Sequence, residues 1–352
     1  MKTSEIIEQI LAGKRQLTES LQRGGARVKN GIREKTETVK SGVNRAKLTV
    51  TEKATEYLVR EALNRDEPRA MTKIIAAMEN VIAGKDFMNT LASSKKKLEE
   101  TPTERIELLS HDGELLIGHL RKCDNPKRIV IAMHGWRSSW GKDFGLISDF
   151  FERSECDVLY VEQRGQNESS GEYMGFGLME RYDCMDWINY VMENMPAKLP
   201  IYLHGVSMGA ATVLMTTGFQ LGGRVHGVVA DCGYTSPDAI CMKVANENFH
   251  VSYKRVSGIA KELFRQKINL GMDEYSTLEA MKVNTTPILF VHGSDDHFVP
   301  VEMTLENYEA CKSTKKLFIV EGADHAMSYY KDPKGYEAVL TEFYAENDDA
   351  LK

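Results

Sequence analysis

A serine between two glycines marks the strongest chemical signal in this chain of 352 residues. Residues 205–209 read Gly-Val-Ser-Met-Gly, after an apolar run at 200–204 and before small residues that favour a helix. In a tight turn from strand to helix, the two glycines allow close backbone contact and the serine hydroxyl is exposed above the sheet. The first N–H groups of the helix then face a negative charge that forms beside that hydroxyl. The pattern predicts that Ser207 is a nucleophile.

A serine hydroxyl needs a base, and the base needs an acid that orients it. The runs 287–292 and 316–320 have the length and β-branched content of buried parallel strands. Asp296 follows the first run and His325 follows the second. Serine, acid and histidine in this order, each after a strand, predict a catalytic triad of Ser207, Asp296 and His325.

Four motifs carry a resemblance to a known family. They are His134-Gly135-Trp136, Gln163-Arg164-Gly165 with Ser169-Ser170-Gly171, the segment 205–209, and His292-Gly293 with Asp296, Val299-Pro300, Gly322 and His325. With these motifs the chain resembles the α/β-hydrolase superfamily, in the branch of bacterial esterases grouped with serine aminopeptidase-like and acyl-thioesterase-like hydrolases. The resemblance covers roughly residues 104–346 and leaves the first hundred unexplained.

The oxyanion site follows from the same reasoning. One donor should be the backbone N–H of Met208, the residue after the nucleophile. By resemblance, the second is the backbone N–H of Trp136, in the loop after the predicted strand 128–133. Gly135 would permit the close backbone approach that this loop requires.

Each assignment has an alternative. Ser207 could be an ordinary helix N-cap, and His325 could be a surface-loop histidine. The spacing of related hydrolases fits Asp296 and not its neighbour Asp295, but some related hydrolases place the acid where Asp231 ends the run 225–230. The polar loop at 162–171 could line the rim of the site or be a structural turn held by Arg164.

The fold class expected is α/β. Strands near 104–109, 114–121, 128–133, 157–161, 200–204, 225–230, 287–292 and 316–320 alternate with helices near 143–153, 177–195, 208–220, 301–312 and 333–346. This alternation predicts a mostly parallel eight-stranded sheet with helices on both faces and sites at the strands' carboxyl ends. We expect a catalytic domain at 101–352. Its segment at about 236–286 is too long for a simple crossover and could form a helical lid over an acyl or aryl pocket, or merely pack on the core.

Residues 1–100 form a separate compositional unit, a predicted helical N-terminal extension. They hold 20 Lys and Arg against 14 Asp and Glu, whereas the rest holds 25 against 37. Small apolar residues recur at helical intervals from Ile32 to Leu58, and a more apolar stretch at 71–91 should pack on the catalytic core or cap its pocket. Docking on the catalytic domain, an oligomerisation arm and an amphipathic membrane-surface helix are the alternatives, and the small side chains favour docking and self-association into a homo-oligomer.

The sequence shows no signal peptide and no run long enough to cross a membrane, so we expect a cytoplasmic protein without an integral membrane segment. The six cysteines lack pairing or metal-ligand spacing. Phosphate loops, dinucleotide fingerprints and zinc motifs are also missing, so no cofactor, metal or nucleic-acid partner is implied. The expected function is hydrolysis of a small-molecule carboxylic ester through an acyl-enzyme intermediate. The alternatives are a thioesterase or small-peptide hydrolase with the same triad, or a non-catalytic binding protein on a hydrolase scaffold.

Overall fold

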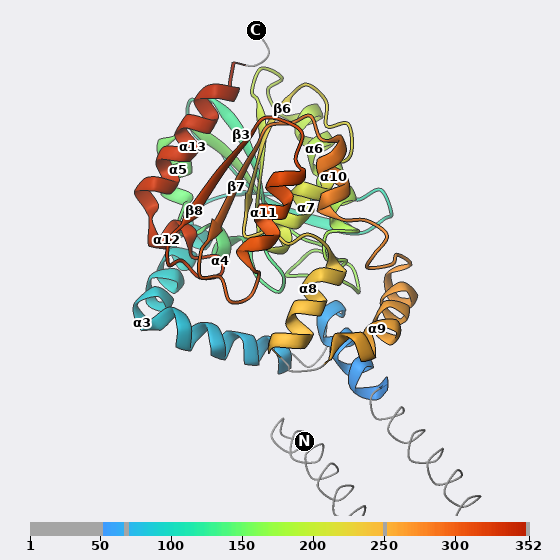
Figure 1. The fold of residues 1–352 in the computed structure, drawn as a ribbon. Coiled ribbons are helices and arrows are strands. Elements are labelled where there is room, and N and C mark those ends of the chain that lie inside the picture. Colours follow the sequence, from blue (N-terminus) through green and yellow to red (C-terminus); the bar gives the residue numbers. More distant parts are fainter. Residues whose placement is uncertain (1–51, 67–69, 249–251, 350–352) are drawn as a thin grey trace, which may run out of the picture.

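The computed structural model describes residues 52–66, 70–248 and 252–349, and its centre is a sheet of eight strands (Figure 1). The strand order is β1-β2-β4-β3-β5-β6-β7-β8. The first two pairings, β1 with β2 and β2 with β4, are antiparallel, and the others are parallel. The strands are β1 (Glu104–Leu109), β2 (Leu115–Arg121), β3 (Arg128–Met133), β4 (Cys156–Glu162), β5 (Ile201–Val206), β6 (Val225–Asp231), β7 (Ile288–Gly293) and β8 (Lys315–Val320). The predicted mostly parallel eight-stranded sheet is confirmed.

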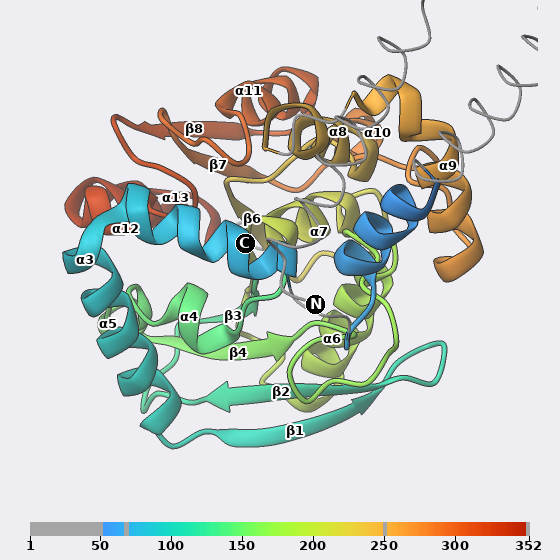
Figure 2. The same cartoon turned by 90° about the horizontal axis from the view of Figure 1, so that it is seen from below.

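The central strands are apolar because both of their faces are covered. Along β3, Ile129 and Ile131 face one hydrophobic core, and Val130 and Ala132 face the other. The first core is completed by α6 (Glu180–Asn194), α7 (Met208–Thr216), α10 (Thr277–Val283) and α11 (Val301–Ala310). The second is completed by α4 (Trp140–Phe144), α5 (Ser148–Arg153), α12 (Ser328–Lys331) and α13 (Pro333–Asn347). Figure 2 shows the two sets of helices on opposite sides of the sheet.

The predicted helix at 143–153 is two short helices in the structure. α4 begins earlier, after Ser139, whose side chain accepts a hydrogen bond from the N–H of Lys142 and caps the helix. At Gly145, a Cβ atom would lie 2.7 Å from the backbone of Ser94. The chain therefore approaches its N-terminal region too closely at this point for any larger residue, and α5 starts after it.

The N-terminal region packs on the sheet domain through two described segments, a helix at 52–63 and α3 (Ala70–Glu100). Gly84, with φ of 79°, divides α3 into two helical parts. Leu98 is buried in the second core, and the ring of Phe87 lies 4.8 Å from that of Tyr330. Most of the apolar stripe predicted from Ile32 to Leu58 lies outside the described residues, so the self-association expected of it stays a prediction.

The segment predicted as a lid contains α8 (Pro237–Lys243), a π-helical turn η1 (Val244–Asn248), α9 (Tyr253–Ile268) and α10. Ala280 and Met281 of α10 are buried in the first core, so α10 is part of the sheet domain. Figure 1 shows α8, α9 and the helix at 52–63 together below the sheet. Within the described residues, no helix combines the length and apolar character needed to cross a bilayer.

Candidate active site

Ser207 occupies the turn between β5 and α7. Its backbone has φ of 55° and ψ of −116°, a conformation that a residue with a side chain adopts only under strain. No residue with a side chain fits at either flanking glycine. A Cβ at Gly205 would lie 2.2 Å from the carbonyl oxygen of Gly209, and a Cβ at Gly209 would lie 1.9 Å from the carbonyl oxygen of Met133. Ser207 N–H donates to the carbonyl of Asp231 at 2.8 Å, which ties the turn to β6.

The structure brings Ser207, Asp296 and His325 together. Nε2 of His325 lies 2.9 Å from Oγ of Ser207, and Nδ1 of His325 lies 2.7 Å from Oδ2 of Asp296. The acid and the histidine stand on the loops after β7 and β8, at the same edge of the sheet as the serine. A histidine between a hydroxyl and a carboxylate can take the hydroxyl proton while the carboxylate stabilises the resulting imidazolium.

The carboxylate of Asp296 is held in position by its own loop. Its Oδ1 accepts hydrogen bonds from the N–H groups of Phe298 and Val299 at 2.9 and 2.8 Å. Nε2 of His292 lies 3.1 Å from Oδ2, and His292 is fully buried. Burial by itself raises the pKa of Asp296, but the charge of His325 and the hydrogen bonds from both histidines outweigh it and keep this pKa below its usual range.

Asp295 and Asp231 do not contact His325 through any hydrogen bond among the described residues. Asp295 is exposed and accepts a bond from Ser294 Oγ at 2.8 Å. Asp231 is buried, and it accepts bonds from the hydroxyls of Ser328 and Tyr336 at 3.1 and 3.0 Å. Of the three carboxylates considered from the sequence, Asp296 is therefore the one that the fold places on the histidine.

The loop after β3 lies beside the nucleophile. A Cβ added to Gly135 would lie 3.2 Å from Cβ of Ser207. Gly135 N–H donates to Oδ2 of Asp143 at 2.6 Å, which fixes the loop. No hydrogen bond among the described residues engages the backbone N–H of Trp136 or of Met208. Their assignment as oxyanion donors stays a prediction.

The loop at 162–171 is a structural turn around Arg164. This fully buried guanidinium donates from Nε to Asp183 at 2.6 Å and from Nη1 to Asp112 at 2.8 Å. Gln163 N–H donates to Nε2 of His134 at 3.2 Å, so the loop also supports the segment that leads into Trp136. Arg164 pairs with carboxylates rather than with the triad.

The loop after β3 also anchors the helix at 52–63. The indole Nε1 of Trp136 donates to the carbonyl of Ala62 at 2.8 Å. Nη2 of Arg137 donates to the carbonyls of Glu61 and Asn64 at 2.7 and 2.6 Å. The carbonyls of Glu61 and Ala62 belong to the helix's last turn and that of Asn64 follows it, where intrahelical partners are lacking and a positive charge is favourable. Sequence reasoning missed this contact, although Ala54 and Leu58 belong to the apolar stripe that indicated a helix.

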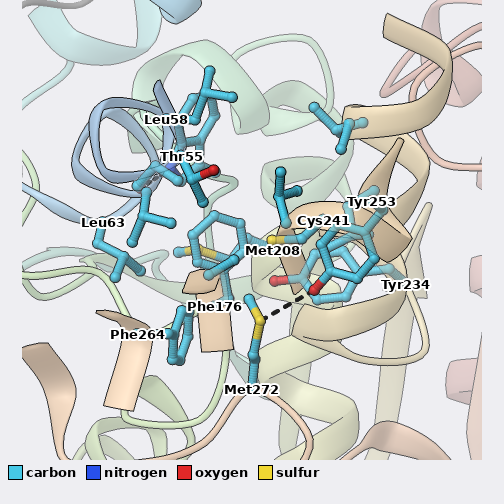
Figure 3. A pocket seen from close by; sticks show the side chains of 18 of the residues that line it. Thr55, Leu58, Leu63, Phe176, Met208, Tyr234, Cys241, Tyr253, Phe264 and Met272 are labelled. Carbon is cyan, nitrogen blue, oxygen red and sulfur yellow. Dashed lines mark hydrogen bonds between the residues drawn. The ribbon is translucent and has the colours of Figure 1, made fainter. Parts of the chain in front are cut away.

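An apolar cavity of about 110 Å³ opens beside Ser207 (Figure 3). The helix at 52–63 contributes one wall through Thr55, Leu58, Val59, Ala62 and Leu63. The predicted lid contributes another through Ile240, Val244, Tyr253, Val256 and Phe264.

The lining of this cavity is largely apolar. No described lining residue is Asp, Glu, Lys, Arg or His. Not every apolar residue of the lid segment is known to line the cavity: Met242 is half exposed on the surface, and Phe249 lies outside the described residues. Such a cavity suits an uncharged, largely apolar group.

The protonation of His325 leads to a prediction about pH. Burial lowers the pKa of His325, but the charge of Asp296 and its hydrogen bond outweigh burial and raise this pKa well above 6.5. A histidine base must be neutral, so activity should be lost as the pH falls through this pKa. We expect kcat/KM for an ester to rise with pH with its midpoint above 6.5.

The matched variant is Asp296→Asn, which removes the charge that raises the histidine pKa. Its acid limb should move to lower pH while its maximum rate falls. A pH profile of kcat/KM for both proteins measures this. An identical midpoint in the two proteins would contradict the assigned pairing of Asp296 with His325.

The chain is similar to known proteins in sequence and in fold. The family model described as serine aminopeptidase, S33, matches residues 124–240, which span the loop after β3 and the serine turn. The uncharacterized protein YqkD of Bacillus subtilis is 26% identical over 234 residues, which cover 66% of this chain and 76% of that protein. Protein bem46 of Schizosaccharomyces pombe is 25% identical over 250 residues, which cover 70% of this chain and 77% of that protein.

A solved structure shows the same architecture. An esterase of Pyrococcus furiosus superposes with a TM-score of 0.58 at 23% identity, over 72% of this chain and 93% of that chain. At this identity the likeness is one of fold. The strand order and this match show that the chain has the α/β-hydrolase fold.

Proposed function

We propose that this protein is a serine hydrolase that cleaves uncharged carboxylic esters through an acyl-enzyme intermediate. The observation that carries the proposal is the hydrogen-bonded series from Ser207 through His325 to Asp296, which opens on an apolar cavity. A hydroxyl, an imidazole and a buried carboxylate at these distances are the groups that acyl transfer needs.

The reaction proceeds in two halves. Ser207 Oγ attacks the ester carbonyl while Nε2 of His325 takes its proton, and the N–H groups of Met208 and Trp136 bind the oxyanion. The tetrahedral intermediate collapses, the C–O bond to the alcohol breaks, and His325 returns the proton to the leaving alkoxide. Water then attacks the acyl-serine with His325 again as the base, which releases the acid and restores Ser207.

We further assign the walls of the cavity to two parts of the chain. The segment α8 to α9 acts as the lid of the catalytic domain at 101–352, and the extension at 1–100 contributes the opposite wall through its helix at 52–63. The lining of the cavity by both segments supports this division. Trp136 links the second wall to the proposed oxyanion site, because its indole donates to the carbonyl of Ala62 in the helix and its backbone N–H is the proposed oxyanion donor.

The length of the acyl chain should control the rate. Each additional buried methylene contributes about 0.8 kcal/mol, so the two methylenes that separate acetate from butyrate correspond to roughly a tenfold gain in kcat/KM. Steady-state hydrolysis of p-nitrophenyl acetate, butyrate and octanoate measures this. Rates that are equal or fall from acetate to butyrate would contradict an acyl-binding cavity.

Leucine p-nitroanilide serves as the control substrate. An aminopeptidase must hold the substrate's ammonium group, and the described lining of the cavity offers no carboxylate for it. We expect this amide to react far more slowly than p-nitrophenyl butyrate. A faster reaction of the amide would favour a peptide hydrolase.

A further inference from the structure

Tyr234 places a buried polar atom in the wall of the apolar cavity. Its side chain is 2% exposed, and its hydroxyl has no hydrogen-bond partner among the described residues. Figure 3 shows Tyr234 among the side chains around the cavity, with Cys241 and Tyr253 close by. A buried hydroxyl without a partner is unfavourable and uncommon in folded proteins. The hydroxyls of Tyr160 and Tyr344 are also buried without a partner among the described residues, but neither residue lines the cavity, whereas Tyr234 does.

Three other polar side chains of this wall have hydrogen-bond partners, whereas the hydroxyl of Tyr234 has none among the described residues. The hydroxyl of Tyr253 donates to Oδ1 of Asp238 at 2.6 Å. The indole of Trp136 donates to Ala62, and Oγ of Ser207 is bonded to His325. Of the described residues that line the cavity, Tyr234 is the one whose side chain has a buried nitrogen or oxygen atom with no hydrogen-bond partner. Burial raises the pKa of Tyr234 well above 10, so the hydroxyl keeps its proton and remains a donor at neutral pH.

In the proposed reaction, the acyl part of the substrate occupies this cavity. His325 must reach the leaving oxygen to return its proton, and His325 does not line the cavity. Ser207, Met208 and Trp136, which bind the carbonyl carbon and the oxyanion, do line it. The leaving group therefore departs on the histidine side, and the acyl chain extends from the oxyanion site between the helix at 52–63 and the lid.

We propose that Tyr234 is a specificity-determining residue that donates a hydrogen bond to an uncharged acceptor oxygen carried by the acyl group. The substrate class is then an ester of a medium-sized, mostly apolar acid that bears one internal carbonyl or ether oxygen. A charged acyl group does not fit, because the described lining contains no cation to pair with a carboxylate. This inference rests on the proposed ester hydrolysis.

The test compares p-nitrophenyl octanoate with p-nitrophenyl oxo-octanoates that place one ketone at successive carbons. The wild type should prefer one ketone position over octanoate by about tenfold in kcat/KM, because the ketone pairs with a hydroxyl that octanoate leaves unpaired. Tyr234→Phe should abolish this preference. Tyr253→Phe is the matched control. The hydroxyl of Tyr253 is already paired with Asp238, so the ratio of kcat/KM for the ketone ester to kcat/KM for octanoate should stay at the wild-type value.

Melting temperatures provide an independent readout. Tyr234→Phe removes an unpaired buried hydroxyl and should melt no lower than the wild type, whereas Tyr253→Phe loses a hydrogen bond and should melt lower. A ketone preference that survives in Tyr234→Phe, or no preference at any position, would overturn the role of Tyr234 while leaving ester hydrolysis intact. Failure of the folded wild type to cleave any of these esters would overturn the proposed function, and this inference with it.

Discussion

Replacing Ser207 with alanine is expected to lower kcat on p-nitrophenyl butyrate by roughly a hundred-thousandfold to a millionfold. The variant removes the oxygen that forms the acyl bond and leaves His325 without a group to activate. The fold should persist, because the hydrogen bonds that position the turn use the backbone of Ser207 and the two flanking glycines. Steady-state rates, with melting temperature as the check on folding, measure this effect.

Ser294→Ala is the matched control for that prediction. Ser294 lies in the loop after β7. Its hydroxyl donates to Asp295 and accepts from the N–H of Gly322, and it does not bond Ser207, Asp296 or His325. We expect its kcat to stay within a few-fold of the wild-type value. If Ser207→Ala and the wild type hydrolysed the ester equally fast, Ser207 would not be the nucleophile. A non-catalytic binding protein on this scaffold would then be the better description.

Asp296→Asn should lower kcat by about ten-thousandfold, because an amide leaves the histidine in the wrong tautomer and without a counter-charge. Two other carboxylates make this prediction discriminating. Asp295→Asn changes an exposed side chain, and Asp231→Asn changes a buried one that accepts bonds from Ser328 and Tyr336. Both should retain kcat within about tenfold, although Asp231→Asn should lose stability.

The three rates decide which carboxylate orients His325. A large loss of activity in folded Asp231→Asn, together with a small loss in Asp296→Asn, would reassign the acid to the end of β6. Melting curves are needed to separate a loss of catalysis from a loss of folding. Asp231→Asn is expected to lower the melting temperature, because Asp231 accepts hydrogen bonds from two buried hydroxyls.

Much of the sheet could be predicted because its strands are buried on both faces. Residues 129–133 and 288–291 are continuous apolar runs for this reason, and the ends of β3 and β7 lie within a residue or two of those predicted. The arrangement of Ser207, Asp296 and His325 was also predictable, since each follows a parallel strand and the carboxyl ends of such strands meet at one edge. Local pattern and chain order were sufficient here.

The walls of the cavity could not be predicted in the same way. The helix at 52–63 reaches the site through bonds from Trp136 and Arg137, which are more than seventy residues away in the sequence. An apolar stripe indicates that a helix is buried, but not which surface buries it. Tyr234 had no periodic or motif signal, because its importance comes from a missing partner that only the packed structure reveals.

The most direct test of the proposed chemistry is to find where a serine-reactive probe becomes attached. A biotinylated fluorophosphonate, incubated with the wild type at pH 8 and followed by peptide mass spectrometry, should leave a single adduct on Ser207. The adduct should be missing in Ser207→Ala and should form far more slowly in His325→Ala, because the histidine no longer accepts the serine proton. Attachment to another residue, or an unmodified protein that remains folded throughout, would contradict the account.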